Sequence, residues 1–171
     1  MQIRFTKHSG KPDWLECIRD DGTSTRCPMP KQGILPHDLV HYVVEESLHL
    51  QQGFWGILAL GVGFPNSAPP WDAADFNLPD LTEALQAESL VECFQAEMWN
   101  GFQPSENFWE ILQITCQQRQ VAVPQSLTHQ DIERIRRRLQ AATRAWDALA
   151  VGETLIVEFY PIDSPGLTQI F

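Results

Sequence analysis

The chain has 171 residues, of which 43% are hydrophobic and 20% charged, which is typical of one globular domain and excludes a disordered chain. Its formal net charge of −10 argues against nucleic-acid and anionic-membrane binding, because attraction to phosphate groups dominates both. No apolar run approaches the roughly 18 residues that cross a bilayer, and the N-terminus lacks the apolar segment of a signal peptide, so we expect a cytoplasmic protein with a single domain, residues 1–171.

Three short strands are predicted within the first thirty residues. Residues 3–6, 14–18 and 24–29 are apolar or alternating, and turn signals, including an Asp-Gly pair, separate them. Near the other end of the chain, residues 154–160 (TLIVEFY) predict a late strand. We expect this late strand to join the N-terminal meander in one small antiparallel sheet.

Four helices are predicted between the meander and the late strand, over residues 36–52, 81–100, 105–118 and 129–150. The second has Asp80 as its expected N-cap, with Glu83 as the capping-box partner, and the fourth has the pair Thr128 and Asp131. Together, the predicted elements indicate an α+β fold in which the sheet packs against about four helices.

The segment between the first two helices has an apolar, glycine-rich part followed by a proline-rich part. Residues 53–64 are apolar and glycine-rich, and they are compatible either with a continued, interrupted helix or with a tight hairpin. Residues 65–80 contain four prolines and predict a loop, and loops of that length often act as lids. The aromatic residues Phe54, Trp55, Trp71 and Phe76 favour core packing over the lining of a pocket.

The four cysteines form no Cys-x-x-Cys pair, so a zinc ribbon has no support. They are Cys17, Cys27, Cys93 and Cys116. A disulfide between the first two is conceivable on neighbouring strands, but free, mostly buried thiols are the stronger expectation in a reducing cytoplasm.

Charge is distributed unevenly along the chain. No lysine or arginine occurs in residues 32–118, and this stretch contains twelve acidic residues and three of the five histidines. Such acids stay solvated, pair with arginines from elsewhere in the fold, or bind a cation. Four arginines of residues 129–150 face away from the apolar side of that predicted helix, so they are expected to be solvated or to pair with these acids: Arg134, Arg137, Arg138 and Arg144.

The first predicted helix carries a polar stripe at a spacing of four residues: His37, His41, Glu45 and His49, with Asp38 beside them. A spacing of four keeps side chains on one helix face, and imidazoles at this spacing can converge on one metal ion. The stripe lies largely opposite the apolar face of the helix, so a solvated stripe is the alternative.

A metal site on this stripe would need ligands from a second element. Three ligands at successive spacings of four span about 12 Å along a helix, which is too long for one ion. Glu88 and Glu92, four residues apart on the second helix, are the best additional candidates, and His8 and His129 are further ones. Two histidines and one carboxylate suit zinc, iron or manganese.

Two functional hypotheses follow. The first is a metal-dependent enzyme, a hydrolase acting on an unidentified small molecule or protein. Its predicted catalytic residues are His37, Asp38, His41 and Glu45, with Asp38 orienting a histidine. Its expected metal ligands are His37, His41, Glu45, Glu88 and Glu92. The second hypothesis is a non-catalytic interaction module, in some forms a homodimer, whose acidic surface meets a partner protein.

The run PHDLVHYVVEESLHLQQGFWG, residues 36–56, resembles a bacterial protein family with a P-H-D-[LV]-x-H-[YF]-x-V-E helix followed by G-F-[WY]-G. The resemblance implies no particular reaction and no cofactor. It implies that His37, Asp38, His41 and Glu45 belong to a shared signature, and that residues 71–76 (WDAADF) form the matching loop or lid.

Overall fold

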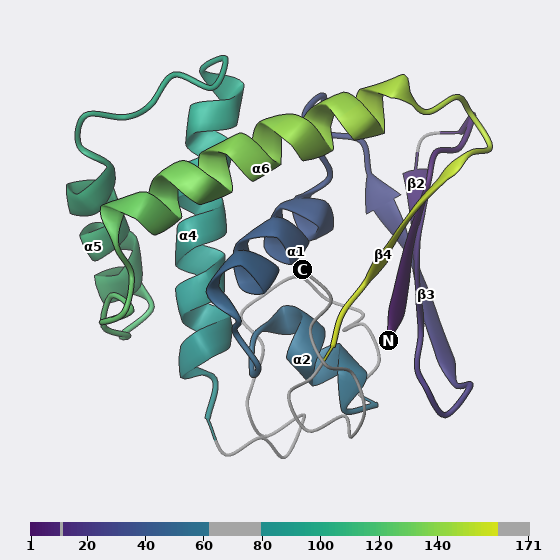
Figure 1. The fold of residues 1–171 in the computed structure, drawn as a ribbon, viewed down its shortest axis with the longest axis horizontal. Helices are drawn as coiled ribbons and strands as arrows, with labels where there is room; N and C mark the ends of the chain where they lie inside the picture. Colours follow the sequence, from purple (N-terminus) through teal and green to yellow (C-terminus); the bar gives the residue numbers. More distant parts are fainter. Residues whose placement is uncertain (11, 62–79, 161–171) are drawn as a thin grey trace.

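The computed structural model describes residues 1–10, 12–61 and 80–160, and within them it confirms the α+β fold (Figure 1). The strands are β1 (Gln2–Thr6), β2 (Pro12–Ile18), β3 (Ser24–Pro30) and β4 (Thr154–Glu158). The helices are α1 (His37–Leu48), α2 (Phe54–Ala59), α4 (Thr82–Trp99), α5 (Phe108–Gln118) and α6 (His129–Ala148).

The four strands form one antiparallel sheet in the order β3-β2-β1-β4. The late strand therefore pairs with the first strand of the meander, as predicted, with Arg4 opposite Ile156. Because side chains alternate between the two faces of a strand, Ile3, Phe5 and Leu15 share one face and are fully buried there.

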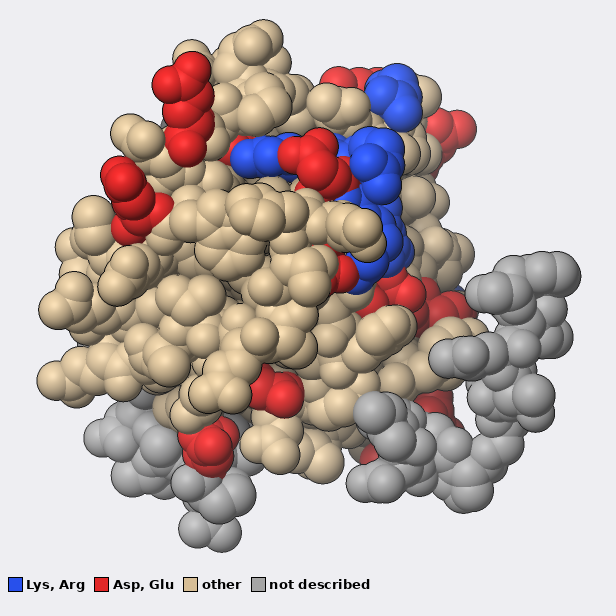
Figure 2. All heavy atoms as spheres, turned by 60° about the vertical axis from the view of Figure 1, so that its left-hand side comes forward, with Lys and Arg blue, Asp and Glu red and all other residues tan. Residues whose placement is uncertain are grey.

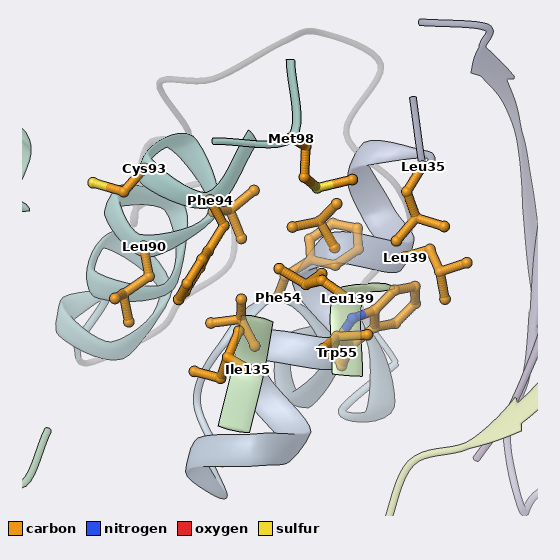
Figure 3. Close-up of a cluster of buried hydrophobic side chains, with 14 of the residues drawn as sticks. Leu35, Leu39, Phe54, Trp55, Leu90, Cys93, Phe94, Met98, Ile135 and Leu139 are labelled. Atoms are coloured by element: carbon orange, nitrogen blue, oxygen red, sulfur yellow. The ribbon is translucent and has the colours of Figure 1, made fainter. Parts of the chain in front are cut away.

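The helices lie together on one side of the sheet, and α6 runs across α1 and α4 (Figure 1). The core between these layers is rich in bulky side chains. Figure 3 shows Phe94 of α4, Leu139 of α6 and Trp55 of α2 pointing into it. This packing fixes α1 against α4, and the candidate site lies between these two helices.

α1 ends earlier than the sequence predicts. His49 adopts the left-handed conformation at φ 54°, and the amide of Leu50 donates to the carbonyl of Glu45 at 2.9 Å, which closes the last turn. Gly53, the predicted stop, instead precedes α2. The open alternative for residues 53–64 is decided in favour of a short helix over residues 54–59, and residues 62–79, including the expected lid, lie outside the described residues.

The predicted capping box of the second helix is wrong. α4 begins at Thr82 with Leu81 as its N-cap and no side-chain cap bond, while Asp80 accepts hydrogen bonds from the amide and hydroxyl of Thr82. Glu83 reaches across to the turn after α1, where its Oε2 accepts the amides of Gln51 at 2.8 Å and Gln52 at 2.6 Å. Glu83 therefore attaches the start of α4 to the corner between α1 and α2.

The predicted capping box of α6 is confirmed. The hydroxyl of Thr128 accepts the amide of Asp131, whose carboxylate in turn accepts the amide of Thr128 at 2.9 Å. Replacing Thr128 with alanine is expected to lower the free energy of unfolding by about 1 kcal/mol, because an amide at the helix start loses its acceptor. Urea denaturation measures this loss, and a loss close to zero would show that water replaces the cap.

The four cysteines are free thiols, as expected, and three of them are buried. Burial raises the pKa of both Cys17 and Cys27 to about 12, so neither is a reactive thiolate at neutral pH. Across the described parts of the chain, no helix combines the length and the apolar character needed to cross a membrane.

Candidate metal centre

Two histidines of α1 and one glutamate of α4 meet where these helices pack. His37 and His41 lie one helical turn apart, and their rings are 4.7 Å apart between centroids. Glu88 approaches both from α4. One ligand atom from each of the three residues can be chosen such that all three atoms lie within 4.8 Å of one another.

His41 is the buried centre of this group, with a side chain only 3% exposed. Its Nδ1 lies 2.9 Å from Oε1 of Glu45, and its Nε2 lies 2.9 Å from Oε2 of Glu88. Glu45 is fully buried, whereas Glu88 is 23% exposed. His41 is therefore held by a carboxylate on each side, one inside the protein and one at its surface.

Glu45 also caps α2. Its Oε1 accepts the amide of Phe54 at 3.2 Å and its Oε2 accepts the amide of Trp55 at 3.0 Å, so its negative charge meets the N-terminus of that helix. A Cβ atom at Gly53 would lie only 2.3 Å from Oε2 of Glu45. Glycine is therefore required at position 53 for α2 to approach this carboxylate.

His37 is held in a similar way but nearer the surface, with 34% of its side chain exposed. Its Nδ1 lies 3.2 Å from Oε1 of Gln95, and Gln95 itself donates to Oε1 of Gln32 at 3.4 Å. The Nε2 atom of His37 lies 3.8 Å from Oε1 of Glu88. Each histidine thus has a partner at Nδ1 and turns its Nε2 towards the same carboxylate.

The charges at the site depend strongly on one another. Burial alone lowers the pKa of His41, but hydrogen bonds and charge attraction from Glu45 and Glu88 outweigh burial and raise it to about 10. Burial raises the pKa of Glu88, and its hydrogen bonds to His37 and His41 more than compensate, so that it is lowered overall. The two carboxylates therefore favour the protonated form of His41.

A metal ion bound here would take the place of the proton between His41 and Glu88. Coordination needs a free electron pair on Nε2, and the contact of Nδ1 with Glu45 favours the tautomer that provides it. Two imidazoles and one carboxylate form a ligand set typical of zinc and other transition ions, with further positions left for water or substrate. This group of residues can therefore hold a divalent metal ion.

The structure brings together only some of the residues predicted for the site. His37, His41 and Glu88 form the group, while Glu45 lies on the far side of His41, away from Glu88. Glu92 pairs instead with Arg119 at 2.9 Å. The expected solvated stripe is also not observed, because His41 and Glu45 are both buried.

The remaining predicted residues occupy other positions. Asp38 is partly buried next to the group; burial raises its pKa, which the nearby histidines partly offset, but in the described region no hydrogen bond joins its carboxylate to either histidine. The histidine-orienting role predicted for Asp38 is performed by Glu45 and Gln95. His49 terminates α1, and His129 accepts a hydrogen bond from Trp109.

Gln95 was missed by sequence reasoning, although a signal for it exists. It lies two helical turns after Glu88, so the two share a face of α4. Metal ligands are mostly ionisable residues, whereas the part played by Gln95 is to hold the Nδ1 of a histidine, which an amide does equally well.

Arginines neutralise several acids of the stretch without basic residues. Arg138 pairs with Glu46, Arg119 with Glu92 and Arg136 with Glu97. Arg136 and Arg138 belong to α6; the pairing of Arg138 was expected from its face of the helix, whereas Arg136 was not predicted to pair. Figure 2 shows basic side chains gathered beside acidic ones on one face of the molecule. Several acidic residues of the stretch 32–118 are therefore paired with arginines inside the fold.

Comparisons with known proteins add no relative. Nothing matches the chain among protein-family models, curated proteins or solved structures. The resemblance of residues 36–56 to a bacterial family stays a prediction, and the functional argument depends on the geometry of His37, His41 and Glu88.

Proposed function

We propose that the protein is a metal-dependent hydrolase that binds a divalent transition ion, zinc, iron or manganese, through His37, His41 and Glu88. The observation that carries the proposal is the shared orientation of the two histidines. Glu45 and Gln95 each hold an Nδ1 atom, and both Nε2 atoms face the two oxygens of Glu88. Two histidines on a solvated helix face would form hydrogen bonds with water, without side-chain partners that orient both rings.

The surroundings of the three ligands support hydrolysis. A divalent ion with protein ligands on one side lowers the pKa of a water bound on the other side towards about 7. His37 and Glu88 are partly exposed, so a substrate reaches the site from solvent, while His41 stays in a dry environment. Asp38 is our candidate for the proton acceptor, because it follows His37 in α1 and its carboxylate interacts electrostatically with His37, His41 and Glu88.

The interaction module is the second hypothesis, and it has less support. Its acidic surface is reduced by the arginine pairs of Glu46 and Glu92. The interaction-module hypothesis also does not explain why the imidazole of His41 is buried between the carboxylates of Glu45 and Glu88. A stabilising role of His41 between α1 and α4 is the simpler alternative that an experiment must separate from metal binding.

Glu88 and Glu92 provide a matched pair for this experiment. They are the same residue type one turn apart on α4, but only Glu88 contacts the histidines. Protein purified without a nickel column and treated with EDTA is expected to bind one equivalent of Zn²⁺, Mn²⁺ or Co²⁺ in calorimetry. We expect Glu88→Gln to weaken this binding at least about tenfold and Glu92→Gln to leave it unchanged.

Hydrolysis is tested on a panel of chromogenic carboxylate and phosphate esters. Activity is expected to require the added ion, to disappear with EDTA, and to be lost in Glu88→Gln but not in Glu92→Gln. Failure of the wild-type protein to bind any of the three ions would overturn the metal site and leave His41 with a stabilising role. Tight binding without metal-dependent hydrolysis of any ester would overturn the enzymatic part alone.

A further inference from the structure

The two edges of the sheet differ in their capacity to pair with another strand. β3 forms one edge and β4 the other. β3 carries Pro28 and Pro30, which lack the amide hydrogen needed for pairing, and prolines are a common protection of sheet edges. β4 contains no proline and has an apolar centre, Leu155, Ile156 and Val157.

The backbone of β4 directs alternate residues towards the free edge. Phe159 exchanges hydrogen bonds with Met1 at 2.9 Å in both directions, and Glu153 accepts the amide of Lys7 at 3.0 Å. Since backbone groups alternate between the two sides of a strand, the odd-numbered residues of β4 pair with β1. The amides and carbonyls of Thr154, Ile156 and Glu158 therefore face outward.

Few groups in the described part of the chain use this outward edge. The carbonyl of Glu158 accepts the hydroxyl of Tyr42 at 3.0 Å and keeps one electron pair for a second donor. Ile156, at the middle of the strand, has a side chain on the outer face of the sheet and is 51% exposed. No strand among the described residues covers this edge, and an exposed isoleucine at such an edge is unfavourable in water unless another strand pairs with it.

We infer that the β4 edge binds the β4 edge of a second copy of this chain, forming a symmetric antiparallel dimer with a continuous eight-stranded sheet. The sequence Thr-Leu-Ile-Val-Glu is self-complementary about its central residue. With a twofold axis at Ile156, the two isoleucines lie opposite each other, Leu155 faces Val157, and Thr154 faces Glu158. Each acidic side chain then meets a hydroxyl group and not another acid.

The backbone favours the same register. Ile156 has an outward amide and an outward carbonyl, so two copies exchange two hydrogen bonds across the axis, and the Thr154 and Glu158 pairs extend the ladder on either side. A shift that centred the axis on Glu158 would place two carboxylates directly opposite each other, which is destabilising. Of these two registers, the one about Ile156 satisfies both the backbone and the side chains.

The exposed isoleucines of β4 and α5 allow a matched test. Ile114 on α5 is 54% exposed, close to the value for Ile156, and it lies outside the sheet. In sedimentation and light-scattering measurements, the wild-type chain is expected to reach twice its mass of 19.5 kDa with rising concentration. Ile156→Lys places like charges across the axis and is expected to weaken the dimer about tenfold or more, while Ile114→Lys leaves it unchanged.

Hydrogen exchange of the wild-type protein tests the register without any substitution. The amides of Thr154 and Ile156 are expected to exchange at least about tenfold more slowly in the dimer than at dilutions where the monomer dominates. A chain that remains monomeric at all concentrations would overturn the proposal. So would a dimer that Ile114→Lys disrupts and Ile156→Lys does not, or one in which these two amides stay unprotected.

Discussion

Replacing Glu45 with glutamine is expected to weaken Zn²⁺ binding by about 10–100-fold while the fold is retained. Oε1 of Glu45 accepts the amide of Phe54 and lies 2.9 Å from Nδ1 of His41, while Oε2 accepts the amide of Trp55 at 3.0 Å. In the glutamine orientation that keeps the oxygen on the amide of Trp55, the NH₂ group takes the place of Oε1. This NH₂ group then faces Nδ1 of His41, which must accept a hydrogen bond. The ring proton moves to Nε2, and that nitrogen loses the electron pair needed for coordination.

Nitrogen chemical shifts of the His41 ring measure this change of tautomer directly, and calorimetry measures the affinity. Glu46→Gln is the matched control, because Glu46 is the adjacent carboxylate of α1 but pairs with Arg138 and not with His41. Wild-type affinity in Glu45→Gln would show that Glu45 does not orient His41, even if the metal site itself is real. Absence of binding in the wild-type protein would instead count against the proposed function.

Replacing Glu97 with alanine is expected to lower the free energy of unfolding by about 3 kcal/mol, a loss typical of breaking a buried ion pair. Glu97 is 6% exposed and accepts two hydrogen bonds from Arg136, at 2.6 and 2.9 Å. It also accepts the amide of Ser105 at 2.8 Å. Removing the Glu97 carboxylate leaves the mostly buried guanidinium of Arg136 and the amide of Ser105 without this partner. Both groups lie where α4, α6 and the loop before α5 meet.

Glu133 offers the control for this second prediction, because it contacts the same arginine from the surface. Its side chain is 55% exposed, and exposed ion pairs contribute less than about 1 kcal/mol. Urea denaturation of Glu97→Ala and Glu133→Ala is therefore expected to give clearly different midpoints. Equal, small losses in both variants would mean that solvent reaches Arg136 and replaces Glu97.

Local patterns of the sequence predicted most of the fold. Strand alternation and turn signals placed the meander, and the capping pair Thr128 and Asp131 placed the start of α6. α2 could not be assigned because its N-terminal acceptor, Glu45, belongs to another helix. The end of α1 was misplaced for a related reason, since His49 adopts a left-handed conformation that sequence preferences assign to glycine.

The candidate site was predictable in part. The spacing of four residues correctly placed His37 and His41 side by side, and Glu88 was among the acids expected to join them. Burial of the polar stripe was not predictable, because helical periodicity describes one helix and not the elements packed around it. α2 and α4 cover the face that appeared solvated, and only their position distinguishes Glu88 from Glu92.

The position of Glu45, which contacts both His41 and the start of α2, has a consequence for how the proposed metal ion would be acquired. α1 carries both histidines, but the amides that fix Glu45 come from α2 and the third proposed ligand, Glu88, comes from α4. An unfolded or partly translated chain would therefore lack a competent site. An ion that binds only the folded chain stabilises it in proportion to the logarithm of the free ion concentration. Under metal starvation, the first effect would then be a smaller pool of intact protein and a shorter lifetime for each molecule.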